Sequence, residues 1–126
     1  MMKMLLLFLL ALSLAACGSV KNPAAPGPTR GLLEVVGVDV AILESYPPQA
    51  VANVEGQLPT VCTAIDEIRV RRQERLVEVT ITTVGTAEVC ILLLPPPVKV
   101  PVHLGYFAEP GEYVLRVNGF EGRFKI

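Results

Sequence analysis

The chain offers few side chains from which a catalytic site could be built. Beyond residue 30 it contains one serine, Ser45, one histidine, His103, and two cysteines, Cys62 and Cys90. Nucleophilic catalysis needs a nucleophile held by a base, and Ser45 and His103 lie in different predicted elements, with no Gly-x-Ser-x-Gly motif around the serine. Redox cycling typically uses a Cys-x-x-Cys motif, which is absent. We therefore expect no hydrolytic or redox activity.

Metal, cofactor and nucleic-acid sites are not expected either. Two cysteines and one histidine are too few for a zinc site and lack the spacing of one. No glycine-rich phosphate-binding loop occurs in the sequence. The chain has 11 Lys and Arg residues against 12 Asp and Glu residues, whereas nucleic-acid binders usually carry a basic face.

The N-terminal residues have the pattern of an export sequence. Lys3 is followed by an apolar run from residue 4 to residue 14, in which Ser13 is the only polar member. A charged start and a short apolar run are typical of a signal peptide. The run is shorter than the roughly 20 apolar residues that cross a bilayer. We assign residues 1–16 to a signal peptide.

The residues that end this run are Leu14, Ala15, Ala16 and Cys17. They resemble the lipobox of bacterial lipoproteins, a resemblance that covers residues 1–18. In that family the cysteine sulfur receives a diacylglyceryl group and the peptide is cut before it. The resemblance implies lipidation of Cys17 and a protein anchored to a bacterial membrane in the cell envelope, outside the cytoplasm. The alternative is an ordinary signal peptide with a chance cysteine.

Two further segments follow the lipobox. Residues 17–30 are rich in proline and glycine and predict a tether. Residues 31–126 are enough for one small domain. Export favours a disulfide between Cys62 and Cys90, which would contribute roughly 3–4 kcal/mol in the chain-entropy model. Two buried free thiols are the alternative.

The domain has the pattern of short strands separated by turns. Alternating apolar residues and Gly, Pro or Asn breaks predict strands at 36–42, 51–58, 65–71, 76–83, 87–93, 98–104, 113–117 and 120–126. Pro101 favours an edge strand, and Asn118 with Gly119 favours a tight type I′ hairpin. Seven to eight such strands predict an all-β fold, an antiparallel Ig-like β-sandwich.

One hairpin, formed by residues 65–83, is specific enough to predict its register. With the turn centred on residues 73 and 74, Val70 faces Val77 on the apolar side and Arg69 faces Glu78 on the polar side. Such opposite charges contribute a few tenths of a kcal/mol. The arginines of this hairpin are expected to form one basic tip.

The domain also resembles a family of small, uncharacterised exported bacterial proteins. The matching residues are 43–47, 56–59, 62, 90, 111–113 and 117–119. This resemblance implies a two-cysteine sandwich and no particular activity.

Two stiff apolar loops are candidate binding sites, although they could equally cover the core. Their residues are Tyr46, Pro47 and Pro48 in one loop, and Pro95, Pro96 and Pro97 in the other. We expect a non-enzymatic binding or structural module whose partner is an envelope protein or another envelope component. The alternative is a secreted proteinase inhibitor, but the Asn-Pro-Thr-Thr-Gly and Arg-Pro-Trp/Phe loops of chagasin-like inhibitors are missing.

Overall fold

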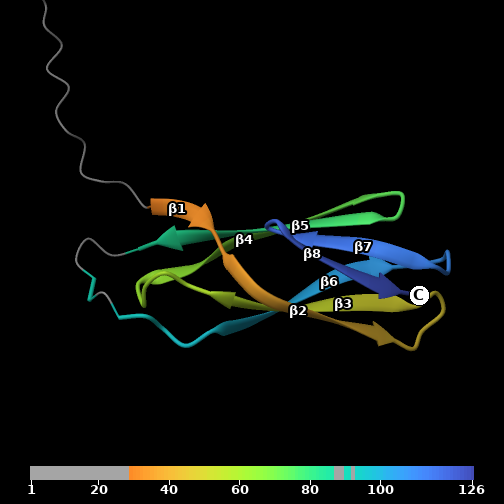
Figure 1. Ribbon diagram of the computed structural model, residues 1–126, viewed down its shortest axis with the longest axis horizontal. Coiled ribbons are helices and arrows are strands. Elements are labelled where there is room, and N and C mark those ends of the chain that lie inside the picture. Colours follow the sequence, from red (N-terminus) through yellow and green to blue (C-terminus); the bar gives the residue numbers. More distant parts are fainter. Residues whose placement is uncertain (1–28, 87–89, 92) are drawn as a thin grey trace, which may run out of the picture.

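The computed structural model describes residues 29–86, 90–91 and 93–126, and these form a two-layered β-sandwich (Figure 1). The strands are β1 (Thr29–Leu32), β2 (Glu34–Leu43), β3 (Gln49–Gln57), β4 (Thr63–Gln73), β5 (Leu76–Gly85), β6 (Val98–Tyr106), β7 (Glu112–Val117) and β8 (Phe120–Lys125). The all-β sandwich predicted from the sequence is confirmed. The predicted signal peptide, Cys17 and most of the tether lie outside the described residues, whereas Thr29 and Arg30 belong to β1.

The strands divide into two sheets. Sheet A contains β1, β4, β5, β7 and β8, and sheet B has the order β2-β3-β6. The chain leaves sheet A after β1, enters sheet B with β2, and crosses between the sheets again before β4, β6 and β7. One pairing departs from the antiparallel sandwich expected from the sequence: β5 and β7 run parallel. The chain crosses to sheet B and back between these two strands, so β7 returns in the direction of β5.

The core lies between the two sheets and is made of alternate residues from both. Its largest fully buried side chains include Phe107, Leu33 and Ile81. Gly56 in β3 permits the packing of Leu33, because a Cβ atom there would lie 2.5–2.8 Å from the Leu33 side chain. Leu33, the residue between β1 and β2, therefore requires a glycine at this position of β3.

The sandwich has two ends that differ in what they carry. At the entry end, where the described chain begins, Thr29 and Thr63 both pair with Gly85. Segments 58–62 and 93–97 and residues 90 and 91 belong to this end, at the left in Figure 1. At the distal end, Leu43 and Tyr106 both pair with Gln49, and the connections 44–48, 74–75 and 107–111 lie there.

The predicted register of the β4–β5 hairpin is wrong by two residues. Val70 faces Val79, and Arg71 is the residue that faces Glu78. The turn is centred one position later than predicted, on residues 74 and 75, and Glu74 takes a positive φ of 54°. A shift of two residues leaves every side chain on the same face, so alternation alone does not distinguish the two registers.

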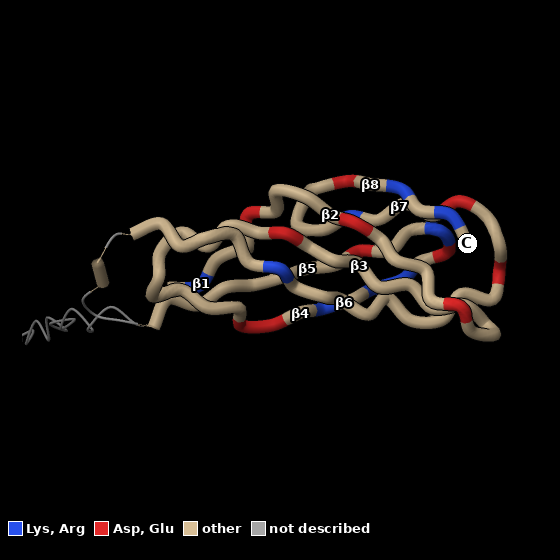
Figure 2. Tube along the Cα trace, turned by 90° about the horizontal axis from the view of Figure 1, so that it is seen from below, with Lys and Arg blue, Asp and Glu red and all other residues tan. Residues whose placement is uncertain are grey.

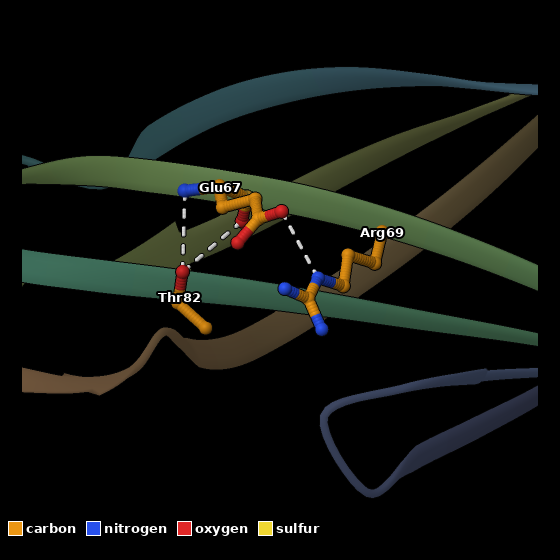
Figure 3. A network of polar contacts seen from close by, with 3 residues as sticks. All are labelled: Glu67, Arg69 and Thr82. Atoms are coloured by element: carbon orange, nitrogen blue, oxygen red, sulfur yellow. Dashed lines mark hydrogen bonds and ion pairs between the residues drawn. The ribbon is translucent and has the colours of Figure 1, made fainter.

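Arg69 has a different partner from the one predicted. Its Nε donates a hydrogen bond to Glu67 Oε1 at 3.0 Å, while Arg69 itself lies opposite Thr80 (Figure 3). The hydrogen bond and the charge of Glu67 raise the pKa of Arg69. Thr82 Oγ1 accepts a hydrogen bond from the Glu67 backbone N–H, beside the β-bulge that interrupts β4. The side chains of Arg69 and Glu67 are both exposed, so the ion pair between them contributes little to stability.

Two other arginines of this hairpin do not form the expected basic tip. Arg72 places its guanidinium 3.8 Å from the centre of the Phe107 ring, and Arg75 lies 5.3 Å from that of Tyr113. These rings pack edge to face in the core at the distal end. The two guanidinium groups therefore cover an aromatic cluster through cation–π contacts.

The remaining strand predictions have mixed outcomes. The predicted strand 87–93 is wrong, because Cys90, Ile91 and Leu93 lie outside any strand; residues 87–89 and 92 are outside the described residues. β6, which contains Pro101, pairs only with β3 among the described strands and is an edge strand as predicted. Asn118 and Gly119 both have positive φ, which confirms the predicted tight turn.

Candidate functional site

The two candidate binding loops lie at opposite ends of the sandwich. Tyr46, Pro47 and Pro48 connect β2 to β3 at the distal end, whereas Pro95, Pro96 and Pro97 precede β6 at the entry end (Figure 1). They cannot form one binding surface. Of the two, the distal loop is the one that gathers polar and aromatic side chains from other strands.

We call the cluster of Ser45, Tyr46, Gln49, His103 and Tyr106 the distal patch. His103 Nε2 donates to Gln49 Oε1 at 2.8 Å, because an amide oxygen only accepts. Gln49 Nε2 in turn donates to Ser45 Oγ at 3.4 Å. The one serine and the one histidine of the domain are thus joined through Gln49, a contact that their sequence separation did not predict.

Two exposed tyrosines complete the distal patch. The side chain of Tyr46 is fully exposed and that of Tyr106 is 56% exposed. The rings of His103 and Tyr106 are tilted, with 6.4 Å between their centres. Tyrosine is enriched in binding surfaces because its rigid ring offers a large contact area and a polar tip.

The backbone of the distal patch is held from both sides. The Pro48 carbonyl accepts a hydrogen bond from the Phe107 N–H at 2.8 Å. The Tyr106 carbonyl accepts one from Arg72 Nη1 at 2.6 Å. Pro47 and Pro48 also fix two φ angles. The patch is therefore positioned before any ligand arrives, which lowers the entropy cost of binding.

The polar chain of the distal patch is not arranged for nucleophilic catalysis. Ser45 Oγ donates its proton to the Pro47 carbonyl at 2.7 Å rather than to a base. His103 is separated from the hydroxyl by Gln49, which cannot carry a proton at neutral pH. A nucleophile has to hydrogen-bond to its base. The arrangement offers donors, acceptors and aromatic rings to a ligand.

Sequence reasoning found the loop but missed Gln49 and Tyr106. Gln49 begins β3 and Tyr106 ends β6, and the two are opposite each other in sheet B. Gln49 directly follows the loop in the chain, whereas only the pairing of β3 with β6 brings Tyr106 to it. The sequence offered one indication of Tyr106 as a surface residue: it follows the alternating run that ends at Leu104.

Other features of the described residues are less suited to ligand binding. A shallow depression of about 610 Å³ lies on the outer face of sheet B, and its polar lining includes Asp39, Asn53, Glu55 and Lys99. The described part of the chain brings no three potential metal-ligating side chains together. Within the described residues we find no helix of the length and apolar character that would cross a membrane.

The expected disulfide is present at the entry end. Cys62 and Cys90 are joined, with 6.0 Å between their Cα atoms. Cys62 precedes β4, and its carbonyl accepts hydrogen bonds from both the backbone N–H and the hydroxyl of Thr86. The disulfide therefore attaches Cys90 to the residue that precedes β4.

Comparison with known proteins places the fold in a family. The chain is similar to two proteins of Herpetosiphon aurantiacus, named "Uncharacterized 10.2 kDa protein in HgiCIIM 5'region" and "Uncharacterized 10.2 kDa protein in HgiBIM 5'region". Each is 24% identical, over 92 and 82 residues; the matches cover 73% and 65% of this chain, and 98% and 100% of the relatives. No solved structure matches. Residues 52–126 match the model of the ORF11 β-sandwich domain, and the chain belongs to this family.

Proposed function

We propose that the protein is an envelope lipoprotein that binds a partner without catalysing a reaction. Cys17 carries the lipid and holds the sandwich at a bacterial membrane, outside the cytoplasm. The distal patch faces away from that membrane and binds an envelope protein or another envelope component. No cofactor, metal ion or nucleic acid takes part.

One observation carries this proposal: the chain enters at one end of the sandwich, and the distal patch lies at the other. Thr29 begins β1 at the entry end, and Tyr46 and Tyr106 lie at the distal end (Figure 1). A protein held by its N-terminus would present the distal end to the compartment. There His103 hydrogen-bonds to Gln49, and Ser45 Oγ donates to the Pro47 carbonyl rather than to a base.

The lipid anchor can be tested by substitution of Cys17. In cells fed radiolabelled palmitate, the wild-type chain should be labelled and should remain in washed membranes, because two acyl chains hold a protein stably. Cys17→Ala should lose the label and leave the membrane fraction. The matched control, Cys62→Ser/Cys90→Ser, removes the other cysteines and should keep the label. Label on Cys17→Ala would refute the lipid assignment.

The role of the distal patch can be tested by photocrosslinking in cells. Benzoylphenylalanine in place of Tyr46 should give a defined adduct, because this side chain is fully exposed at the proposed interface. Adding Tyr106→Ala should reduce the adduct about tenfold, since a buried interface tyrosine contributes 1–2 kcal/mol or more. The photoprobe at Thr80, an exposed position on β5, is the control. Equal adducts from both positions, or insensitivity to Tyr106→Ala, would contradict the proposed site.

A further inference from the structure

We infer that the entry end of the sandwich rests on the lipid bilayer through the side chains of Val61, Ile91, Leu93 and Leu94. This inference rests on the proposed lipidation of Cys17 and adds an orientation to it. The acyl chains would hold the protein at the membrane, and this apolar surface would set which end of the domain touches it.

The four side chains are exposed and lie on two segments that the Cys62–Cys90 disulfide joins. Ile91 is 73% exposed, Leu94 71%, Leu93 60% and Val61 52%. Val61 precedes Cys62, and Ile91 follows Cys90, so the disulfide brings the two segments together. Single exposed aliphatic residues are common, but clustered ones mark an interaction surface.

The segment that carries three of these residues is held at both of its ends. Cys90 is bonded to Cys62, and the Pro95 carbonyl accepts a hydrogen bond from Gln57 Nε2 at 2.8 Å. The Pro95–Pro97 run stiffens the return to β6. Ile91, Leu93 and Leu94 lie between these two fixed points, and their side chains are exposed.

The charges of the described residues favour a membrane as the occupant of this surface. Segments 58–65 and 90–97 contain no charged residue, and Glu88, which precedes the second segment, lies outside the described residues. Figure 2 shows acidic residues along the sandwich and at the distal end, whereas the entry end, at the left, is mostly tan. The nearby charged residue in β1 is Arg30, which is exposed and suits anionic headgroups. A carboxylate-rich surface would be repelled by such headgroups.

The position of the tether makes the same face available to the bilayer. Thr29 lies at the entry end and follows Cys17 by 12 residues, a stretch that spans at most about 40 Å. A chain of this length keeps the surface at a high effective concentration near the lipid. Weak apolar contacts are then enough to dock the domain, because the acyl chains have already brought it to the membrane.

The test uses single tryptophans in the acylated full chain, which has no natural Trp. Leu94→Trp and, as the matched control, Tyr46→Trp are reconstituted in vesicles of phosphatidylethanolamine and phosphatidylglycerol brominated near the carbonyl end of the acyl chains. An apolar surface lies about 5–10 Å into the headgroup boundary, so Leu94→Trp should be quenched at least about threefold more than Tyr46→Trp. Adding Ile91→Glu should reduce this quenching, and adding Thr80→Glu should not.

The outcomes separate the two proposals. A chain that lacks the acyl mass and does not float with vesicles refutes the lipid anchor. A chain that is acylated and floats, yet shows equal quenching at both positions, refutes docking alone. A blue-shifted but unquenched Leu94→Trp would place a protein, such as a second copy of this chain, on the surface, and would also overturn the inference.

Discussion

Asn118→Asp should lower the free energy of unfolding by about 2–4 kcal/mol at neutral pH. The Asn118 side chain bridges the gap that β1 and β7 leave along the edge of β5. Its Nδ2 donates to the carbonyls of Leu33 at 2.9 Å and Ile81 at 2.8 Å, and its Oδ1 accepts from the Ile81 N–H at 2.9 Å. Aspartate has the same shape as asparagine, but it replaces the Nδ2 amide group, which donates both hydrogen bonds, with a carboxylate oxygen. This oxygen would face the carbonyl oxygens of Leu33 and Ile81.

The effect of Asn118→Asp should also depend on pH. The two carbonyl oxygens disfavour the charged form, so the pKa of the new carboxyl group is raised in the folded state. The neutral acid can donate one hydrogen bond. Part of the unfolding free energy that Asn118→Asp loses should therefore be present at pH values below the ordinary aspartate pKa. That part should be lost as pH rises through the folded-state pKa. Urea unfolding at several pH values measures both effects.

Asn118→Gly is the matched control for the turn. Glycine accepts the left-handed conformation of residue 118, where φ is 48°, and removes the amide without adding a charge. It should cost less than Asn118→Asp at neutral pH and should lack the extra pH dependence. An aspartate variant within about 0.5 kcal/mol of wild type at neutral pH would contradict the bridging role of the side chain.

Removing the disulfide should cost roughly 3–4 kcal/mol of unfolding free energy. The bond closes a loop of 28 residues in sequence separation, and the unfolded chain gains conformational freedom when it is absent. Cys62→Ser/Cys90→Ser should therefore unfold at a lower urea concentration. Its fold should survive, because Gln57 still holds Pro95 and Thr86 still bonds to the backbone carbonyl of residue 62.

The reduced wild-type chain provides the control for this variant. Treated with dithiothreitol, it should unfold with nearly the same midpoint as Cys62→Ser/Cys90→Ser, because both lack the same cross-link. The double variant should show no further change on reduction. Equal stability of oxidised and reduced wild-type chain would contradict a stabilising role of the disulfide.

Local patterns were sufficient to predict most strands of this domain. Local patterns predicted seven of them within a few residues, since a strand with one buried face repeats every two residues. The exceptions are informative. The continuous apolar run around Ile91 predicted a strand, but Ile91, Leu93 and Leu94 lie outside any strand and their side chains are exposed. Periodicity alone did not distinguish a buried strand from an apolar surface segment.

The sequence by itself determined the all-β class, the edge position of β6 and the tight turn at Asn118, because each depends on neighbouring residues. The tertiary structure alone decided the register of the β4–β5 hairpin, since its two candidate registers bury the same face. It also decided the distal patch. Gln49 and His103 are 54 residues apart and meet only because β3 pairs with β6. Such contacts depend on packing between distant segments, which local sequence patterns do not specify.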